Sequence, residues 1–275
     1  MSVTAIVPVF NRPLELQRAI TSIVNQTKAV DEIIIIDDGS SDSTAEVIQQ
    51  FKNKHPDLIH SFYQKNEGVS AARNLAIQHA KGDWIAFLDS DDEWLENKIE
   101  TFLEIHQQQD CLLFHSDEIW IRNGVRVNAM KKHQKQGGWI FKNCLPLCVI
   151  SPSASIIHKS IFDKVGVFDE TLPACEDYDL WLRICHQYPV TYSEQLLIKK
   201  YGGHEDQLSS KYWGMDRFRI YAIDKLLKNN HLSVENEAAA INMLCKKTKI
   251  LLKGAHKHNN QSVIDMFTPI LEQYD

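Results

Sequence analysis

The sequence has no long apolar run, no regular cysteine pattern and no excess of positive charge, and each absence excludes a class of protein. Its apolar stretches fall short of the roughly 18 to 20 uninterrupted residues that a helix needs to cross a bilayer. Its 6 cysteines are scattered and not set at the spacings of a disulfide framework, which favours a reducing compartment. The 30 Lys and Arg against 36 Asp and Glu give a net charge of -6, so we expect no nucleic acid partner.

The first apolar run and a late basic stretch both bear on localisation. The run Thr4 to Phe10 is too short for a signal-peptide core and lacks a basic leader, so we interpret it as a buried strand and expect a cytoplasmic protein. The segment 246–258 carries Lys and His residues that could lie against anionic lipid, giving a peripheral contact with the inner face of the membrane. A solvated helix face is the alternative interpretation.

Short apolar runs alternate with amphipathic stretches in the first 90 or so residues. The runs are Ala5 to Phe10, Glu32 to Ile36, Leu58 to Tyr63 and Trp84 to Leu88. Residues at helical spacing follow each of the first three runs, and Pro13 stands where a first helical turn accepts it. The pattern predicts repeated strand-helix units feeding a mostly parallel α/β sheet, with ligands bound at the carboxyl ends of the strands.

The pattern changes in the second half of the chain. Asn123-Gly124 between two short apolar stretches is typical of a hairpin, which predicts that the sheet becomes mixed. Three helices and no strand are expected after about residue 205, over Trp213 to Leu227, Ala238 to Leu252 and Ser262 to Leu271. We therefore predict a domain of residues 1–205 followed by a helical extension of residues 206–275.

Two acidic turns follow predicted strands. The first, Asp89-Ser-Asp-Asp92, offers oxygen ligands of the kind that Mg²⁺ and Mn²⁺ prefer, and open coordination positions on such a cation can hold a diphosphate. Capping of a helix that begins near Glu93 is the alternative. The second turn contains Asp37 and Asp38, whose carboxylates could accept hydrogen bonds from a base or a ribose, or could simply form the turn. Both turns are expected along the same edge of the sheet.

Three further features point to chemistry at that edge. Arg73 is the one basic residue of an otherwise neutral helix opening, which favours an anionic partner, with an ion pair to a nearby Asp as the alternative. The acids of Glu176-Asp-Tyr-Asp179 begin a predicted helix and exceed what capping requires, so they suit general-base catalysis at a hydroxyl. In the loop Gly202-Gly-His204, the imidazole could ligate a metal or bind phosphate.

These pieces together resemble the family 2 glycosyltransferases, which have the GT-A fold. The matching stretches are Ile6 to Arg12, Ile36 to Asp42, Asn66 to Asn74, Phe87 to Asp92, Val165 to Glu170 and Glu176 to Arg183. The resemblance implies a Rossmann-like, mixed but mostly parallel sheet flanked by helices. It extends from residue 5 to about residue 210, so the C-terminal helices lie outside it as an appendage.

The resemblance also implies roles for individual residues. The nucleotide would lie against Pro8, Val9, Asn11, Arg12, Asp37, Asp38, Arg73, Asp89 and Ser90. A divalent metal, Mn²⁺ or Mg²⁺, would be held by Asp89, Asp91 and His204. Asp177 would be the catalytic base, supported by Glu176 and Asp179, in a single inverting displacement.

The expected reaction moves a sugar from a nucleoside diphosphate, UDP above others, to a glycan or a lipid-linked acceptor in cell-surface polysaccharide or glycolipid synthesis. A non-catalytic nucleotide-sugar-binding module on the same fold is the main alternative, because a fold does not fix a function. Such a module is expected to lack the base or a metal-binding acid, and this sequence retains both. A nucleotidyltransferase would show a glycine-rich basic loop near the first strand, and Val7 to Asn11 has neither feature.

Overall fold

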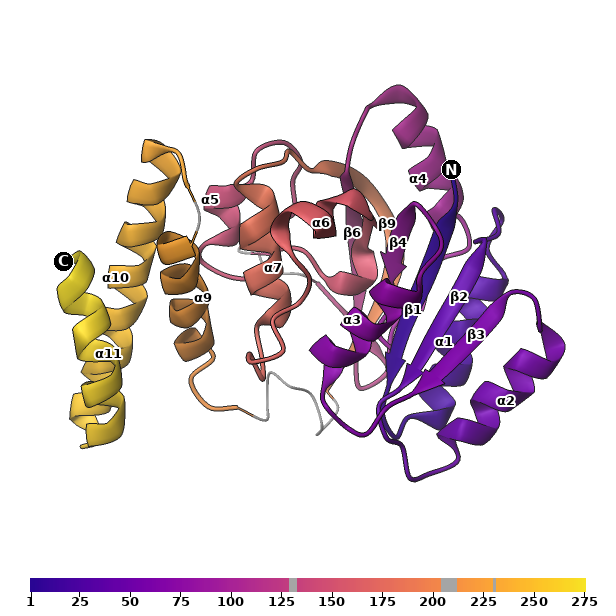
Figure 1. Cartoon of the computed structure of the whole chain (residues 1–275), viewed down its shortest axis with the longest axis horizontal. Helices are drawn as coiled ribbons and strands as arrows, with labels where there is room; N and C mark the ends of the chain where they lie inside the picture. The colour runs from indigo at the N-terminus through magenta and orange to yellow at the C-terminus, as the bar shows by residue number, and fades with distance from the viewer. Residues whose placement is uncertain (129–132, 204–211, 230) are drawn as a thin grey trace.

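The protein folds around a twisted sheet with helices on both faces (Figure 1). The computed structural model describes residues 1–128, 133–203, 212–229 and 231–275. Within these residues the sheet has nine strands in the order β3-β2-β1-β4-β8-β6-β9-β5, with β7 paired to β6. The strands are β1 (Val3–Val9), β2 (Glu32–Asp37), β3 (Ile59–Tyr63), β4 (Trp84–Phe87), β5 (Glu93–Trp94), β6 (Leu113–Arg122), β7 (Val125–Val127), β8 (Ser155–His158) and β9 (Thr191–Gly202).

The predicted parallel half of the sheet is confirmed, and so is the change to a mixed sheet. Strand β1 pairs in parallel with β2 and β4, and β2 pairs in parallel with β3. Strand β8 then runs antiparallel to both β4 and β6, whereas β9 runs parallel to β6. The Asn123-Gly124 turn joins β6 to β7 as predicted, because both residues adopt the positive φ angles that a two-residue hairpin turn requires.

Two hydrophobic cores lie on opposite faces of the sheet, because successive strand residues point to opposite sides. Ala5 and Val7 of β1 pack on one face, and Ile6 packs on the other. The first core is covered by α1 (Pro13–Val24), α2 (Thr44–Lys54) and α4 (Lys98–Gln108). The second is covered by α3 (Val69–His79), α5 (Phe141–Cys144), α6 (Ser160–Val165) and α7 (Glu176–Cys185). The sheet is thereby held rigidly from both sides.

Strands β1 and β4 separate at their carboxyl ends, and Pro8 lies where they part. Their pairing ends at Ile6 and Phe87, whereas β1 stays paired with β2 as far as Val9 and Asp37. By the two-residue period, Pro8 follows Ile6 on the β4 side, and proline has no N–H to continue a ladder there. The segment after β4 is therefore free to turn away from the sheet, and this edge is where a ligand crevice is expected in an open α/β sheet.

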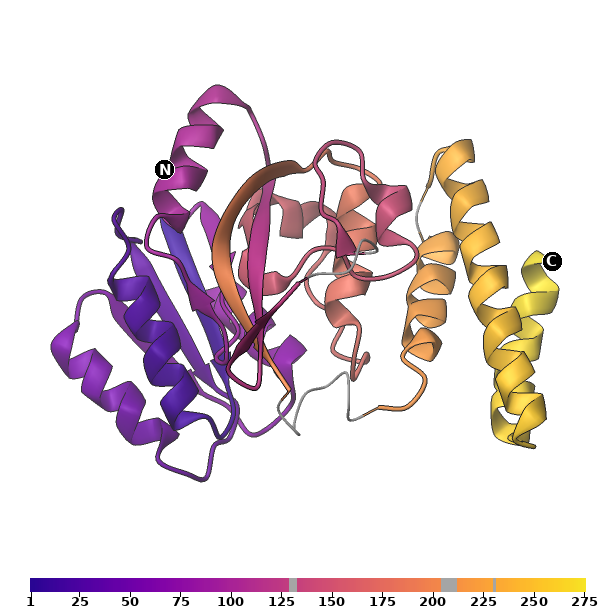
Figure 2. The same cartoon turned by 180° about the vertical axis from the view of Figure 1, so that it is seen from behind.

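Helices α9 (Asp216–Asn229), α10 (Val234–Lys257) and α11 (Gln261–Tyr274) gather at the end of the molecule away from β1 to β3 (Figures 1 and 2). All three helices were predicted. Helix α9 buries Phe218, Ile223 and Leu226 in the same core as α7. The predicted boundary at residue 205 falls outside the described residues, so the division into residues 1–205 and 206–275 stays a prediction. In the described part of the chain, none of the helices combines the length and apolar character needed to span a membrane.

Candidate active site

The acidic turn after β4 and the first turn of α7 are joined by one arginine. Arg73 extends from α3, where Nη2 donates to Asp89 Oδ1 at 2.7 Å and Nη1 donates to Glu176 Oε1 at 2.8 Å. Only 3% of the Arg73 side chain is exposed, so both ion pairs are shielded from water. The sequence alternatives for Arg73 were an anionic ligand or an ion pair with an acid, and the structure shows ion pairs with two acids.

Burial and pairing shift the protonation equilibria of these groups in different directions. Burial opposes ionisation of Asp89, but the Arg73 guanidinium outweighs it and holds the pKa of Asp89 below its ordinary value. Burial, and then the charge of Asp177, raise the pKa of Glu176 above its ordinary value despite the contact with Arg73. Of the two acids that contact Arg73, Asp89 is therefore the one that stays ionised.

Arg12 and Asp91, predicted to bind nucleotide and metal respectively, are in direct contact. Arg12 Nη1 lies 2.8 Å from Asp91 Oδ2, and Arg18 Nη2 donates to the Asp91 carbonyl at 2.5 Å. Asn11, at a positive φ of 50°, fastens the loop after β2, since its N–H donates to Ser40 Oγ and its Oδ1 accepts from the Ser41 N–H. The loops after β1, β2 and β4 thus form one assembly.

The surroundings of Asp92 and Ser90 indicate that both residues support the structure. Asp92 Oδ2 accepts from Ser153 Oγ at 2.6 Å and Oδ1 accepts from the Tyr201 N–H at 3.0 Å. Burial, and then the nearby Asp91, raise the pKa of Asp92 well above its ordinary value. The alternative that these acids cap a helix near Glu93 is wrong, because Glu93 enters strand β5 and α4 begins at Lys98. Ser90 is buried beside them, 4% exposed.

Asp37 and Asp38 both organise loops at the ends of β1 and β2. Asp37 Oδ1 accepts from the Ser40 N–H, which is the turn-forming contact that the sequence allowed. Asp38 accepts from Gln64 Nε2 and from the N–H groups of Glu67 and Gly68, at 2.7 to 2.9 Å. A carboxylate offers about four lone-pair sites, so about one remains on Asp38 for a ligand. Val9 ends β1 directly beside this pair.

Asp177 is the half-buried acid of the α7 opening. Its Oδ1 accepts from the Tyr178 N–H at 2.6 Å, and its Oδ2 lies 3.2 Å from the Cys148 thiol. Burial, and then the Asp177 charge, raise the pKa of Cys148 well above its ordinary value, so this thiol stays protonated and can donate. Asp177 Oδ2 therefore has one hydrogen-bond partner among the described residues, and that partner is a weak donor.

Asp179 forms ion pairs with Arg183 and Lys225, away from the acidic turn. Its Oδ2 accepts from Arg183 Nε and Nη2 at 2.9 and 2.7 Å, and its Oδ1 lies 2.5 Å from Lys225 Nζ. Arg183 in turn donates to the Val167 carbonyl before α7, and Lys225 belongs to α9. The acid is 1% exposed and ties α7 to its neighbours, whereas Glu176 is linked to the acidic turn through Arg73.

Lys200, which the sequence did not single out, also reaches this region. It lies on β9, and its Nζ donates to Ser151 Oγ at 3.1 Å, two residues before the Ser153 that binds Asp92. A pair of lysines at the end of an apolar strand and just before Gly202-Gly203 was the available signal. Strand β9 continues past Lys200 to Gly202, because it pairs with β6 as far as Arg122.

The acids present fit a hard cation that is completed by a ligand. In the residues that the structure describes, no group of three His, Cys, Asp or Glu side chains is arranged to hold a metal. Asp89 and Asp91 supply carboxylates at the crevice, and Mg²⁺ is usually held by one or two carboxylates plus substrate phosphates and water. His204, the third predicted ligand, lies outside the described residues.

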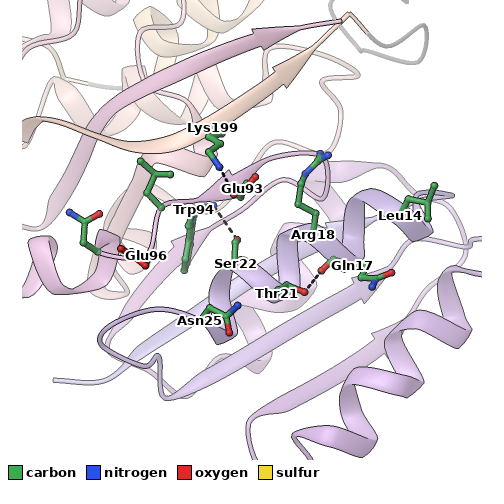
Figure 3. A pocket seen from close by; sticks show the side chains of 12 residues that line it. Leu14, Gln17, Arg18, Thr21, Ser22, Asn25, Glu93, Trp94, Glu96 and Lys199 are labelled. Carbon is green, nitrogen blue, oxygen red and sulfur yellow. Dashed lines mark hydrogen bonds and ion pairs between the residues drawn. The ribbon is translucent and has the colours of Figure 1, made fainter. Parts of the chain in front are cut away.

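A separate groove lies on the other side of the acidic turn. It has a volume of about 630 Å³ between α1 and β5, and Figure 3 shows Arg18 on one side and Glu93 with Lys199 on the other. Arg18 links the groove to the acidic turn, because its guanidinium also donates to the Asp91 carbonyl. The groove lining is built from α1 and the Glu93–Asn97 segment, so the acids joined by Arg73 lie outside it.

Comparisons with known proteins agree with this architecture. A glycosyltransferase of Rickettsia conorii described as uncharacterized is 30% identical over 215 residues, which cover 76% of this chain and 35% of that protein. The chain thus spans about a third of the length of that relative. Escherichia coli WfgD, named a UDP-Glc:alpha-D-GlcNAc-diphosphoundecaprenol beta-1,3-glucosyltransferase, is 30% identical over 182 residues, which cover 66% of this chain and 69% of WfgD.

Solved structures share the fold. S. aureus TarS 1-349 in complex with UDP-GlcNAc superposes with a TM-score of 0.71 at 19% identity, covering 90% of this chain and 71% of that one. The mannosyltransferase PcManGT from Pyrobaculum calidifontis, in complex with GDP-Man and Mn²⁺, gives 0.64 at 14% identity, covering 99% and 84%. The fold is therefore of the GT-A type. Residues 4–166 match the family described as Glycosyl transferase family 2, and the chain belongs to that family.

Proposed function

We propose that the protein transfers a sugar from a nucleoside diphosphate to an acceptor hydroxyl. The observation that carries this proposal is the Arg73 bridge, which sets Asp89 of the acidic turn and Glu176 of the α7 opening against one guanidinium. A donor held at the turn then lies beside Asp177, the next residue of α7. Transfer requires the donor and the base to lie side by side, because a base removes a proton only from a hydroxyl within hydrogen-bond reach.

The nucleoside would lie over the ends of β1 and β2. Pro8, Val9 and Arg12 border this place, and Asp38 keeps about one acceptor site for a base N–H. UDP is the favoured nucleotide, since WfgD is named for UDP-Glc and TarS was solved in complex with UDP-GlcNAc. The GDP-Man bound to PcManGT makes GDP the second choice.

A divalent cation would be held by Asp89 and Asp91, with His204 as a third ligand. The Mn²⁺ in the PcManGT complex and the low pKa of Asp89 support this assignment. When bound, the cation would act as a Lewis acid toward the departing diphosphate. Arg73 keeps Asp89 ionised and in place, and Arg12 holds Asp91 in place in the absence of ligand.

Asp177 would remove the acceptor proton while the acceptor oxygen attacks the anomeric carbon from the face opposite the diphosphate, which inverts that carbon. Its Oδ2 is the oxygen for this task, because its neighbour Cys148 is only a weak donor, whereas Oδ1 is held by the Tyr178 N–H. Glu176 supports the base by fixing the helix opening through Arg73, and Asp179 supports it through Arg183.

The acceptor is proposed to be a glycan or a lipid-linked sugar of the cell envelope. The name of WfgD specifies a lipid-linked sugar, GlcNAc-diphosphoundecaprenol, as the acceptor, which supports the second choice. A cytoplasmic enzyme with peripheral contact at the inner membrane face would reach such an acceptor. Part of the basic stretch is committed to the fold, since Lys247 pairs with Asp216 at 2.9 Å and Lys249 with Asp275 at 2.6 Å. Lys246 and Lys253, both exposed on α10, would make the lipid contact.

A donor screen tests the proposal. Purified protein is incubated with UDP-, GDP- and dTDP-sugars in Mn²⁺ or in EDTA, and release of the nucleoside diphosphate is measured. Turnover of one donor that stops in EDTA is the expected result. Tight binding of a donor without any release would support a non-catalytic binding module instead, and no binding of any donor would contradict both.

A further inference from the structure

Strand β9 sends two adjacent lysines to opposite faces of the sheet. Lys199 Nζ pairs with Glu93 at 2.7 Å and lines the groove beside α1 (Figure 3). Lys200 points the other way, as alternation along a strand requires, and its Nζ donates to Ser151 Oγ at 3.1 Å. Ser151 begins the short helix Pro152–Ala154, whose Ser153 holds both the N–H of Asp89 and the carboxylate of Asp92. Lys200 is therefore linked to the acidic turn through this short helix.

Four carboxylates act on the Lys200 ammonium through their charge, and within the described part of the chain none of them forms an ion pair with it. Burial opposes its charge, but the acids Glu118, Asp92, Asp89 and Asp177 together raise the pKa of Lys200 above its ordinary value. The side chain is therefore positively charged at neutral pH. Its influence extends from the acidic turn to the α7 opening, which is the span that a diphosphate and a transferred sugar would occupy.

Lys200 differs from the two arginines of the site in the N–H donors that remain available to a ligand. Arg12 and Arg73 each contact carboxylate oxygens at 2.7 to 2.8 Å. Among the described residues no carboxylate lies within 4.0 Å of Lys200 Nζ, and its one hydrogen bond is to the neutral Ser151 hydroxyl. An ammonium has three N–H donors, so about two remain for a ligand.

We propose that Lys200 binds the diphosphate of the donor and stabilises it as the leaving group. This inference rests on the proposed function. During transfer the bond from the anomeric carbon to the diphosphate oxygen breaks, and its electron pair stays on that oxygen. The acceptor oxygen bonds to the anomeric carbon and its proton passes to Asp177. Negative charge thus develops on the diphosphate, where a positioned ammonium stabilises it more in the transition state than in the bound donor.

The alternative is that Lys200 only balances the buried charge of Glu118 and Asp92. The two roles differ in what they predict for ligands that differ by one phosphate. A diphosphate-binding lysine contributes to the affinity for UDP or GDP and much less to that for UMP or GMP. A lysine that balances protein charge changes the affinities for diphosphate and monophosphate by the same factor.

The experiment is calorimetric titration of the full chain in Mn²⁺ with UDP, UMP, GDP and GMP, comparing wild type, Lys200→Met and Lys199→Met. For the nucleoside that binds, Lys200→Met is expected to lower the diphosphate-to-monophosphate affinity ratio by about 10-fold or more, equal to about 1.4 kcal/mol. Lys199→Met should leave that ratio unchanged, because Lys199 faces the groove. Lys200→Gln, which can still bond to Ser151, replaces Lys200→Met if the latter does not fold, with the same expectation.

An unchanged ratio in the Lys200 variants overturns this inference and leaves the proposed function standing. If wild type itself binds UDP and GDP no more tightly than UMP and GMP, the donor site is absent and both proposals fail. As a second readout, Lys200→Met should lower kcat for release of the nucleoside diphosphate at saturating donor. If Lys200 only balances buried charge, it does not stabilise the transition state, and this kcat should not fall.

Discussion

Arg12 Nη1 lies 2.8 Å from Asp91 Oδ2, so a residue predicted to contact the nucleotide neutralises a residue predicted to hold the metal. The contact is partly exposed, with 20% of the Arg12 side chain and 13% of the Asp91 side chain accessible to solvent. A metal and Arg12 would therefore compete for the same carboxylate. Binding of the donor offers Arg12 a phosphate in exchange, which couples metal binding to donor binding.

The first prediction follows from this competition. Arg12→Gln should bind Mn²⁺ more tightly than wild type when no nucleotide is present, by about 5-fold, because a partly exposed ion pair of about 1 kcal/mol no longer opposes the metal. Electron paramagnetic resonance of free Mn²⁺ measures this affinity. Arg122→Gln, an exposed arginine at the end of β6, is the control. Weaker Mn²⁺ binding in Arg12→Gln would mean that Asp91 is not a metal ligand.

The second prediction concerns the Arg73 bridge. Arg73→Met leaves Asp89 and Glu176 in a buried place without their shared cation, and loss of one partner of a buried pair costs about 3 to 5 kcal/mol. We expect a loss near the lower value, because the Asp89 side chain is 24% exposed. Urea unfolding measures the difference, with Arg122→Met as the control. A loss below about 1 kcal/mol would show that the bridge does not hold the site together.

The third prediction is a pH dependence of stability that originates at His115. Burial, and then the charge of Lys135, lower the pKa of His115 from 6.5 to about 3. Below pH 6.5 the unfolded chain takes up a proton that the folded protein refuses, so stability is present above this pH and is lost as the pH falls toward 3. One such proton gives a slope of about 1.4 kcal/mol per pH unit.

His115→Gln isolates this effect, because glutamine cannot titrate but can still donate to the Gln136 carbonyl that His115 Nε2 contacts at 3.0 Å. Between about pH 6.5 and pH 5, wild type should lose about 2 kcal/mol more than the variant in urea unfolding. Curves that run parallel over this range would show that His115 does not stay neutral in the folded protein.

The fourth prediction concerns Cys148, whose thiol lies 3.2 Å from Asp177 Oδ2. Cys148→Ala removes this donor and frees the carboxylate to rotate, so kcat for transfer should fall by about 2- to 5-fold, as expected for a weak hydrogen bond. The KM for the donor should not change, because the Cys148 thiol bonds to Asp177 and to the Ile150 carbonyl, and neither residue is assigned to the nucleotide. Cys245→Ala on α10 is the control. A rise in donor KM at constant kcat would place Cys148 in the donor site instead.

Strands β1 to β4 were predictable because each buried run is bounded by turn residues, and the Asn123-Gly124 hairpin because its turn admits few other residues. Strand β5 was not predictable. It is two residues long and pairs with Ile198 and Lys199 of β9, whose other edge pairs in parallel with β6. Such partners are far apart in the chain, and no local pattern records them.

The roles of neighbouring acids in α7 were only partly predictable. Helical periodicity places Glu176, Asp179 and Arg183 on one buried face, and the spacing of Asp179 and Arg183 is that of an ion pair within a helix. That spacing already separated Asp179 from Asp177. Lys200 could not be found in this way, because Ser151 and the carboxylates around it come from segments that meet only in the folded sheet.

The most direct test of the whole account is a comparison of donor binding with sugar transfer in Asp177→Asn. Asparagine keeps the shape of the side chain and removes the base, so the affinity for the donor in Mn²⁺ should stay within about 3-fold of wild type while transfer falls by about 100-fold or more. The matched variant Asp57→Asn, an exposed acid before β3, should keep both. Transfer at near wild-type rate in Asp177→Asn would contradict the assignment of the base and the mechanism built on it.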